Sequence, residues 1–172
     1  SRRPKHMGKP DSDTREPPRL LLPREDAVNT EIIPEDAPLH DRIRAAMDAY
    51  PNLARVGFFN PRDRNFSAVE LESSRAELLS DTCVSEIEVC LNYLRGVRKV
   101  KKPNVGSYEL KHVVEQWAKM QGTPTYISNG SLIVAAAVAG YPIEEVGLIN
   151  CFVGVSLRDA RAIDKQTSAA LW

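Results

Sequence analysis

Positively charged side chains gather in one stretch of this sequence, and their chemistry is that of anion binding. Between residues 95 and 112 there are six basic residues and one acidic residue, Glu109, a net charge of +5. The basic residues are Arg95, Arg98, Lys99, Lys101, Lys102 and Lys111. Lysine and arginine neutralise phosphate charges, and the free amides at the start of a helix predicted from Ser107 can bind the same anion. The stretch therefore predicts a surface for nucleic acid or for an acidic partner.

Two further residues complete this candidate nucleic-acid or anion site. Tyr108 can stack on a base. His112 comes directly before the apolar pair Val113-Val114, which favours a packing or capping role over that of a catalytic base. The alternative for the whole stretch is a solvated connector, whose positive charges follow the C-terminus of a helix and interact favourably with its dipole.

Two predicted helices, 107–121 and 130–139, raise the question of a helix-turn-helix motif. The link Gly122–Asn129 is longer than the usual three or four residues. The second helix presents apolar side chains such as Leu132 and Ile133, whereas a recognition helix needs donors for base edges. The pattern therefore favours a core element over a DNA-reading helix.

Cysteine and histidine are placed unfavourably for nucleophilic or metal chemistry. Cys83 and Cys90 are seven residues apart on a predicted helix and face the core together, which predicts buried thiols. The histidines at 6, 40 and 112 have no metal-ligand spacing, and no Walker or Rossmann glycine pattern occurs. We expect no metal and no cofactor. An enzyme that uses His112 near Tyr108 is the third hypothesis, because active sites assemble from residues distant in sequence.

Paired carboxylates are the remaining source of acid–base chemistry. They occur as Glu70/Glu72, Glu86/Glu88 and Glu144-Glu145. None lies in a glycine- or aromatic-rich pattern typical of a cleft that raises a carboxyl pKa. We predict that all three pairs are solvated.

The composition is that of a globular protein, with 42% hydrophobic and 27% charged residues in a chain of 172. The 23 basic residues balance the 23 acidic ones, so any nucleic-acid role must come from local clustering. No run of 18 apolar residues occurs, which argues against a membrane-spanning helix and a membrane partner. The N-terminus lacks the apolar segment of a secretory signal, and we predict a cytoplasmic protein.

The pattern of the chain changes near Pro38. Residues 1–37 hold six of the twelve prolines and show no helical or strand periodicity, which predicts a disordered arm. Residues 38–172 are predicted to form a single, mainly helical domain with minor β structure.

Apolar residues at helical spacing predict the elements of that domain. Helices are expected at Leu39–Tyr50, at Ser73–Leu79, from a cap at Asp81 or Thr82 through Leu94, at 107–121, at Ser131–Ala139 and from Ser156 through Ile163. Strands are expected at Phe66–Leu71 and within Gly147–Val155. The helix Ser131–Ala139 is apolar all round and so must be buried, with Ser128 or Asn129 as its cap and Gly140 as its stop.

Residues 80–160 resemble a group of small proteins carried by phages, plasmids and integrative elements. The resemblance rests on SYxLKHxxE at 107–115, YxSNGxxIxAA at 126–136 and GY at 140–141. It implies a mobile-element context and an all-α-rich fold, and it implies no particular reaction.

These observations predict a non-enzymatic accessory or regulatory protein of a mobile genetic element. It would bind DNA or RNA, or an acidic partner, through the basic surface. The alternative is a protein–protein interaction module, an inhibitor or a self-associating subunit such as a homodimer. That module would use an apolar face containing Tyr141, Phe152 and Trp172.

Overall fold

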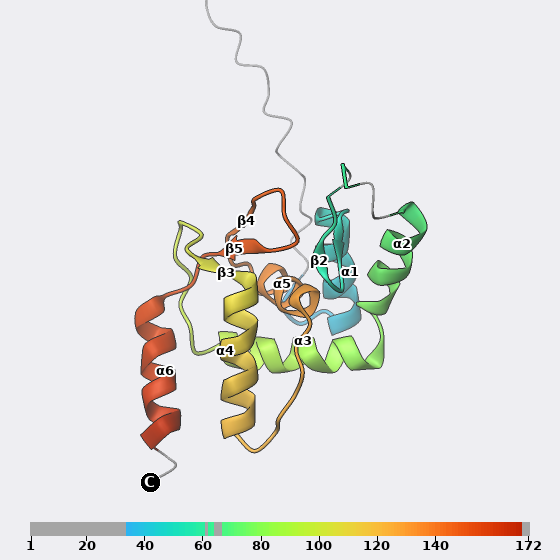
Figure 1. The fold of residues 1–172 in the computed structure, drawn as a ribbon. Coiled ribbons are helices and arrows are strands. Elements are labelled where there is room, and N and C mark those ends of the chain that lie inside the picture. The colour runs from blue at the N-terminus through green and yellow to red at the C-terminus, as the bar shows by residue number, and fades with distance from the viewer. Residues whose placement is uncertain (1–33, 61, 64–66, 170–172) are drawn as a thin grey trace, which may run out of the picture. The chain divides into compact units, whose positions relative to one another are not determined.

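The computed structural model describes residues 34–60, 62–63 and 67–169, which all belong to one compact unit of the chain, Glu31–Trp172. Residues 1–33 of the predicted disordered arm lie outside the described residues. Within the described part the fold is mainly helical, as predicted, with six helices and five short strands (Figure 1). No helix in these ranges is long and apolar enough to cross a bilayer.

The elements follow one another along the chain with short connections. Their bounds are α1 Leu39–Ala49, β1 Leu53–Ala54, β2 Gly57–Phe58, α2 Ala68–Glu77, α3 Asp81–Leu94, β3 Val105–Gly106, α4 Ser107–Met120, α5 Asn129–Val138, β4 Ile143–Glu145, β5 Cys151–Val153 and α6 Leu157–Ala169. The strands form two small antiparallel sheets, the hairpin β1-β2 and the three-stranded sheet β3-β5-β4.

Helix α5 is the centre of the fold. Every residue from Asn129 to Ala136 is buried, and the helix packs against α1, α3 and α4. In Figure 1 it lies between α4 on one side and α1 on the other. Ser128 caps it by accepting a hydrogen bond from the amide of Ser131 at 3.2 Å, and Gly140 follows it at φ +79°. The predicted buried helix, its cap and its glycine stop are all confirmed.

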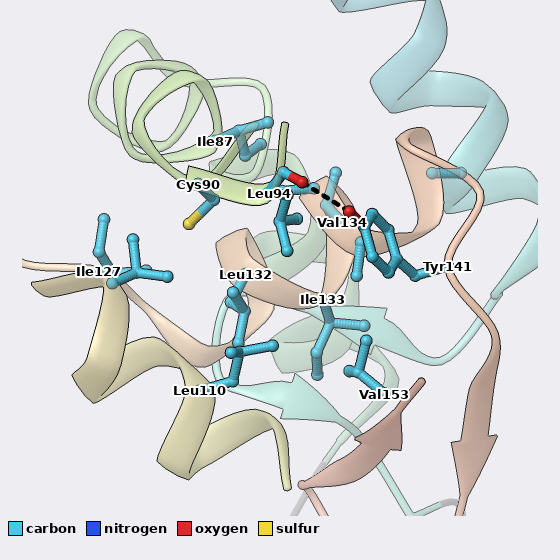
Figure 2. Packing of buried hydrophobic residues seen from close by; sticks show 14 of the residues in the cluster. Ile87, Cys90, Leu94, Leu110, Ile127, Leu132, Ile133, Val134, Tyr141 and Val153 are labelled. Carbon is cyan, nitrogen blue, oxygen red and sulfur yellow. Dashed lines mark hydrogen bonds between the residues drawn. The ribbon is translucent and has the colours of Figure 1, made fainter. Parts of the chain in front are cut away.

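The core is built where α3 and α4 meet α5. Figure 2 shows Ile87, Cys90 and Leu94 of α3 beside the apolar side chains of α5. Leu132 and Ile133 are fully buried there, and each such side chain stabilises the fold by about 1.5–3 kcal/mol relative to an exposed one. The hydroxyl of Tyr141 donates to the carbonyl of Leu94 at 2.6 Å and also lies against the carbonyl of Val97. It thereby provides a hydrogen-bond donor for the last carbonyl of α3.

One strand prediction is wrong, and the other is confirmed over part of its range. Helix α2 covers most of the predicted strand Phe66–Leu71, because Ser67 and Glu70 form a reciprocal capping box that starts a helix at Ala68. Phe66 itself lies outside the described residues. The run Gly147–Val155 forms a strand only at Cys151–Val153, since a turn at Gly147 folds it back on β4.

The predicted cap of α3 also differs from the observed one, whereas α4 starts at Ser107 as predicted. Ser80, not Asp81 or Thr82, caps α3 by accepting from the amide of Cys83. Gly106 precedes α4, and the hydroxyl of Ser107 instead accepts from the amide of Cys151 at 3.1 Å. Ser107 therefore ties α4 to β5. The last helix begins as predicted, with Ser156 bonded to the amide of Asp159, but it continues beyond Ile163 to Ala169.

Candidate functional site

The segment Arg95–Lys102, here called the basic loop, carries five of the six predicted basic site residues on the surface. It leaves the end of α3, runs beside the start of α6 and leads to β3 (Figure 1). Arg95, Arg98, Lys99, Lys101 and Lys102 are all exposed. Residues 89–108 contain no acidic side chain, so the charged side chains of the loop itself are all positive.

The backbone of the basic loop is anchored rather than free. The amide of Val100 donates to the carbonyl of Gly154 at 3.1 Å, and Lys99 forms a β-bridge with Val155. Asn104, just after the loop, exchanges two side-chain hydrogen bonds with the backbone of Val155, at 2.9 and 3.1 Å. These contacts hold the loop against the segment between β5 and α6. Its charges are therefore presented on a preorganised backbone, which reduces the entropy lost on binding.

One of the five charges is already paired. The guanidinium of Arg98 makes two hydrogen bonds to the carboxylate of Asp159, at 2.9 and 3.0 Å, and the amide of Arg98 makes a third at 2.9 Å. The Arg98 side chain, followed by its amide, lowers the pKa of Asp159 to about 2. Asp159 is thus ionised at neutral pH, and Arg98 serves mainly to fasten the loop to α6.

The remaining charges of the loop have no ion-pair partner among the described residues. They belong to Arg95, Lys99, Lys101 and Lys102. Arg95 donates to the amide oxygen of Asn92 at 3.1 Å, and the ammonium of Lys99 lies 5.5 Å from the ring centre of Tyr141. Four cations therefore face solvent with no carboxylate from the described part of the chain to neutralise them.

The structure separates Lys111 from these residues. The residue is only 4% exposed, and its ammonium donates to the carbonyl of Ile127 at 3.0 Å and to Glu115 Oε1 at 3.1 Å. Glu115 Oε1 in turn accepts from the amide of Ile127 at 3.0 Å. Lys111 and Glu115, one turn apart on α4, thus hold both backbone groups of Ile127. Lys111 is an interior anchor and does not contribute to the surface patch.

The environment of Glu115 favours its ionised form. Burial by itself would raise the pKa of Glu115, but hydrogen bonds from the Ile127 amide, Lys111 and His112 outweigh burial and lower it. His112 is half exposed, and its Nδ1 lies 3.0 Å from Glu115 Oε2. His112 is therefore a partner of a structural carboxylate.

Two exposed tyrosines lie beside the anchor at Lys111. The ammonium of Lys111 lies 5.2 Å from the ring centre of Tyr108 and 4.9 Å from that of Tyr126. The two residues, here called the tyrosine pair, are 51% and 65% exposed. The ring of His112 meets that of Tyr108 edge-on at 4.6 Å. Sequence reasoning identified Tyr108 and missed Tyr126, because nothing in the spacing of residues 122–128 shows that this link returns along α4.

A buried polar cluster corrects the prediction that Glu86 is solvated. Glu86 is 3% exposed, and its Oε2 accepts from the hydroxyls of Ser131 at 2.6 Å and Ser128 at 3.0 Å. The cluster lies at the N-terminus of α5. Both serines are buried, so the cluster positions α5 and offers no accessible nucleophile.

The predicted buried thiols are confirmed. Cys83, Cys90 and Cys151 are free and buried. Burial raises the pKa of the Cys90 thiol, and it raises the pKa of the Cys151 thiol to about 11. Both are therefore protonated and unreactive near neutral pH. In the described part of the chain, no three histidine, cysteine, aspartate or glutamate side chains are grouped as metal ligands.

An open groove of about 310 Å³ lies between α3, α4 and α6. Its lining consists of Asn92, Tyr93, Gly96, Trp117, Gln121, Ile163 and Gln166. None of these side chains is charged, so the groove offers amides and aromatic surface rather than acid–base groups.

Comparisons with known proteins do not assign the chain to a family. No family model matches it, and neither the curated proteins nor the solved structures gave a match. The mobile-element context thus stays a prediction.

Proposed function

We propose that this chain is a non-enzymatic nucleic-acid-binding protein, an accessory or regulatory component of a mobile element, whose basic loop contacts phosphate groups. The observation that supports the proposal is a set of four exposed cations on an anchored loop, none of which has an ion-pair partner among the described residues. The whole chain has no net charge, so this positive patch is a local cluster and does not result from a high overall positive charge. The mobile-element context rests on the sequence resemblance alone.

The loop has the properties expected of a phosphate-binding segment. Flexible lysines lose side-chain entropy when they are fixed by a ligand, but the backbone that carries these lysines is already held by β5 and the start of α6. Arg98 forms an ion pair with Asp159 and thereby keeps the loop in place. The other cations keep their charge for an external anion.

The size of the patch predicts the salt dependence of binding. Four phosphate contacts correspond to a slope of about −3 to −4 in a plot of log affinity against log salt. Affinity should therefore fall roughly 50- to 150-fold between 50 and 200 mM salt. A neutral binding surface would show almost no such change.

The test is a titration of labelled oligonucleotides of mixed sequence, followed by fluorescence anisotropy. The variant Lys101→Glu/Lys102→Glu removes two contacts, so binding should weaken by more than about tenfold and the salt slope should fall to about half. The matched control is Lys119→Glu/Lys165→Glu, which changes the net charge equally at two exposed sites in α4 and α6. Absence of binding at 50 mM salt, or an equal loss of affinity in the two variants, would refute the proposal.

A second candidate, a protein-interaction module, is favoured by a separate observation. Val146, Leu148 and Ile149, in the turn between β4 and β5, are 42–67% exposed. Val56 of the β1-β2 turn lies beside them, because the side-chain amide of Asn129 reaches the carbonyls of both Val56 and Ile149 at 3.2 Å.

This apolar surface replaces the face predicted from the sequence. Tyr141 is buried in the core, Phe152 is 41% exposed on β5, and Trp172 lies outside the described residues. For the interaction module we expect a dimer in sedimentation equilibrium that dissociates on Leu148→Ser. A monomer at all concentrations would count against self-association.

A further inference from the structure

We infer that the nucleic acid bound by this chain is single-stranded, and that its bases stack on the tyrosine pair, Tyr108 and Tyr126. This inference rests on the proposed function, since the basic loop must bind the backbone of the same strand. It adds a second contact surface and a class of ligand that the loop alone does not specify.

The tyrosine pair is exposed yet held in place. A surface tyrosine usually rotates freely and loses that freedom when a ligand binds. Here the ammonium of Lys111 lies 5.2 and 4.9 Å from the two ring centres, and it is itself fixed by the Ile127 carbonyl and Glu115. Each ring therefore has a fixed cation beside it, a contact that stabilises this ring position. Half or more of each tyrosine nevertheless faces solvent.

Stacking on such rings selects unpaired bases. In a duplex each base face is covered by its neighbours, whereas in a single strand the faces are free to stack on aromatic side chains. Proteins that bind single strands combine a positive surface for the backbone with aromatic rings for the bases. The described structure provides both components, one on the basic loop and the other at the start of α4.

The two components are close enough for one strand. Lys102 and Tyr108 are six residues apart, so their Cα atoms lie within about 20 Å even if the chain between them is fully extended. A stretch of about four nucleotides, the lower end of known single-strand site sizes, covers a distance of this order. The exposed carboxylate of Glu109, next to Tyr108, repels phosphates. The backbone should therefore follow the basic loop while the bases turn toward the rings.

The experiment compares a single-stranded oligonucleotide with the duplex of the same sequence at 50 mM salt. Tyr126→Ala removes a ring that is 65% exposed, and single-strand affinity should fall about five- to 140-fold. Duplex affinity should stay within about twofold, because phosphate contacts through the basic loop are unaffected. Tyr126→Phe keeps the ring and should restore single-strand binding. Tyr108→Ala should reproduce the effect of Tyr126→Ala.

The outcomes separate this inference from the proposed function. If both nucleic acids bind and Tyr126→Ala leaves single-strand affinity unchanged, stacking is refuted while the basic loop remains a binding site. If Tyr126→Ala weakens single strand and duplex equally, the ring has a structural role and the inference is overturned. If neither nucleic acid binds to the wild-type chain, the proposed function fails and the stacking inference fails with it.

Discussion

Replacing Lys111 by methionine tests whether this lysine is an interior anchor or a member of the binding surface. Methionine keeps the apolar stem but removes the ammonium, so the buried carbonyl of Ile127 loses its side-chain donor. An unsatisfied buried carbonyl costs about 1–3 kcal/mol. The lost contacts with Tyr108 and Tyr126 add about 1 kcal/mol. We expect Lys111→Met to lower the free energy of unfolding by about 2–4 kcal/mol.

Urea denaturation followed by circular dichroism measures this loss. With a denaturant slope of about 2 kcal/mol per M, the midpoint should fall by about 1–2 M. The control is Lys119→Met, two turns further along α4 and exposed, which should change stability by no more than about 0.5 kcal/mol. If the two variants unfold at the same urea concentration, the interior role of Lys111 is refuted.

The ion pair between Lys111 and Glu115 also predicts how stability depends on pH. The pKa of Glu115 is lowered in the folded state, so its ionised form stabilises the fold above the ordinary carboxyl pKa. This stability is lost as pH falls through the lowered pKa. Because the variant lacks the cation that faces Glu115, Lys111→Met should lose less stability than wild type over this acid range. A parallel loss in both proteins would show that Lys111 and Glu115 are not coupled.

Two further predictions concern the backbone and a surface ion pair. At Gly130 an added Cβ would lie 1.9 Å from the carbonyl oxygen of Ala54, so Gly130→Ala should abolish cooperative thermal unfolding. The control Gly106→Ala, whose Cβ would meet nothing closer than 3.9 Å, should fold normally. Folding of both variants would contradict the close approach of α5 to β1. The pKa of Asp159 is lowered to about 2, so its contribution to stability should be present above about pH 4 and vanish as pH falls toward 2. Asp159→Asn should therefore flatten this part of the curve of stability against pH. An unchanged curve would contradict the ion pair with Arg98.

The sequence predicts the helical framework well because apolar periodicity reports directly on burial. The apolar run Leu132–Ala139 predicts a buried helix, and α5 is one. The error at Phe66–Leu71 has a physical origin: six residues of alternating polarity are outweighed by the Ser67–Glu70 capping box, which satisfies two backbone amides at once.

The candidate site was harder to predict, since burial of a charged side chain depends on elements distant in sequence. Glu86 lies on the same helical stripe as Cys83 and Cys90, and that position was the available signal that it faces the core. Its two serine partners are more than forty residues away. Lys111 follows the buried residue Leu110 on α4, which was a similar but weaker signal that Lys111 faces the core. The position of Tyr126 has no local signal, because it depends on how Ile127 is held.

The place of α5 in the chain has a consequence for how the protein folds during synthesis. The helices α1, α3 and α4 all rest on α5, yet all three leave the ribosome before it does. Until Asn129–Val138 emerges, the apolar faces of α1, α3 and α4 lack their common partner. The nascent chain therefore carries these apolar faces without their common partner until α5 emerges, and the full core can form only after that point.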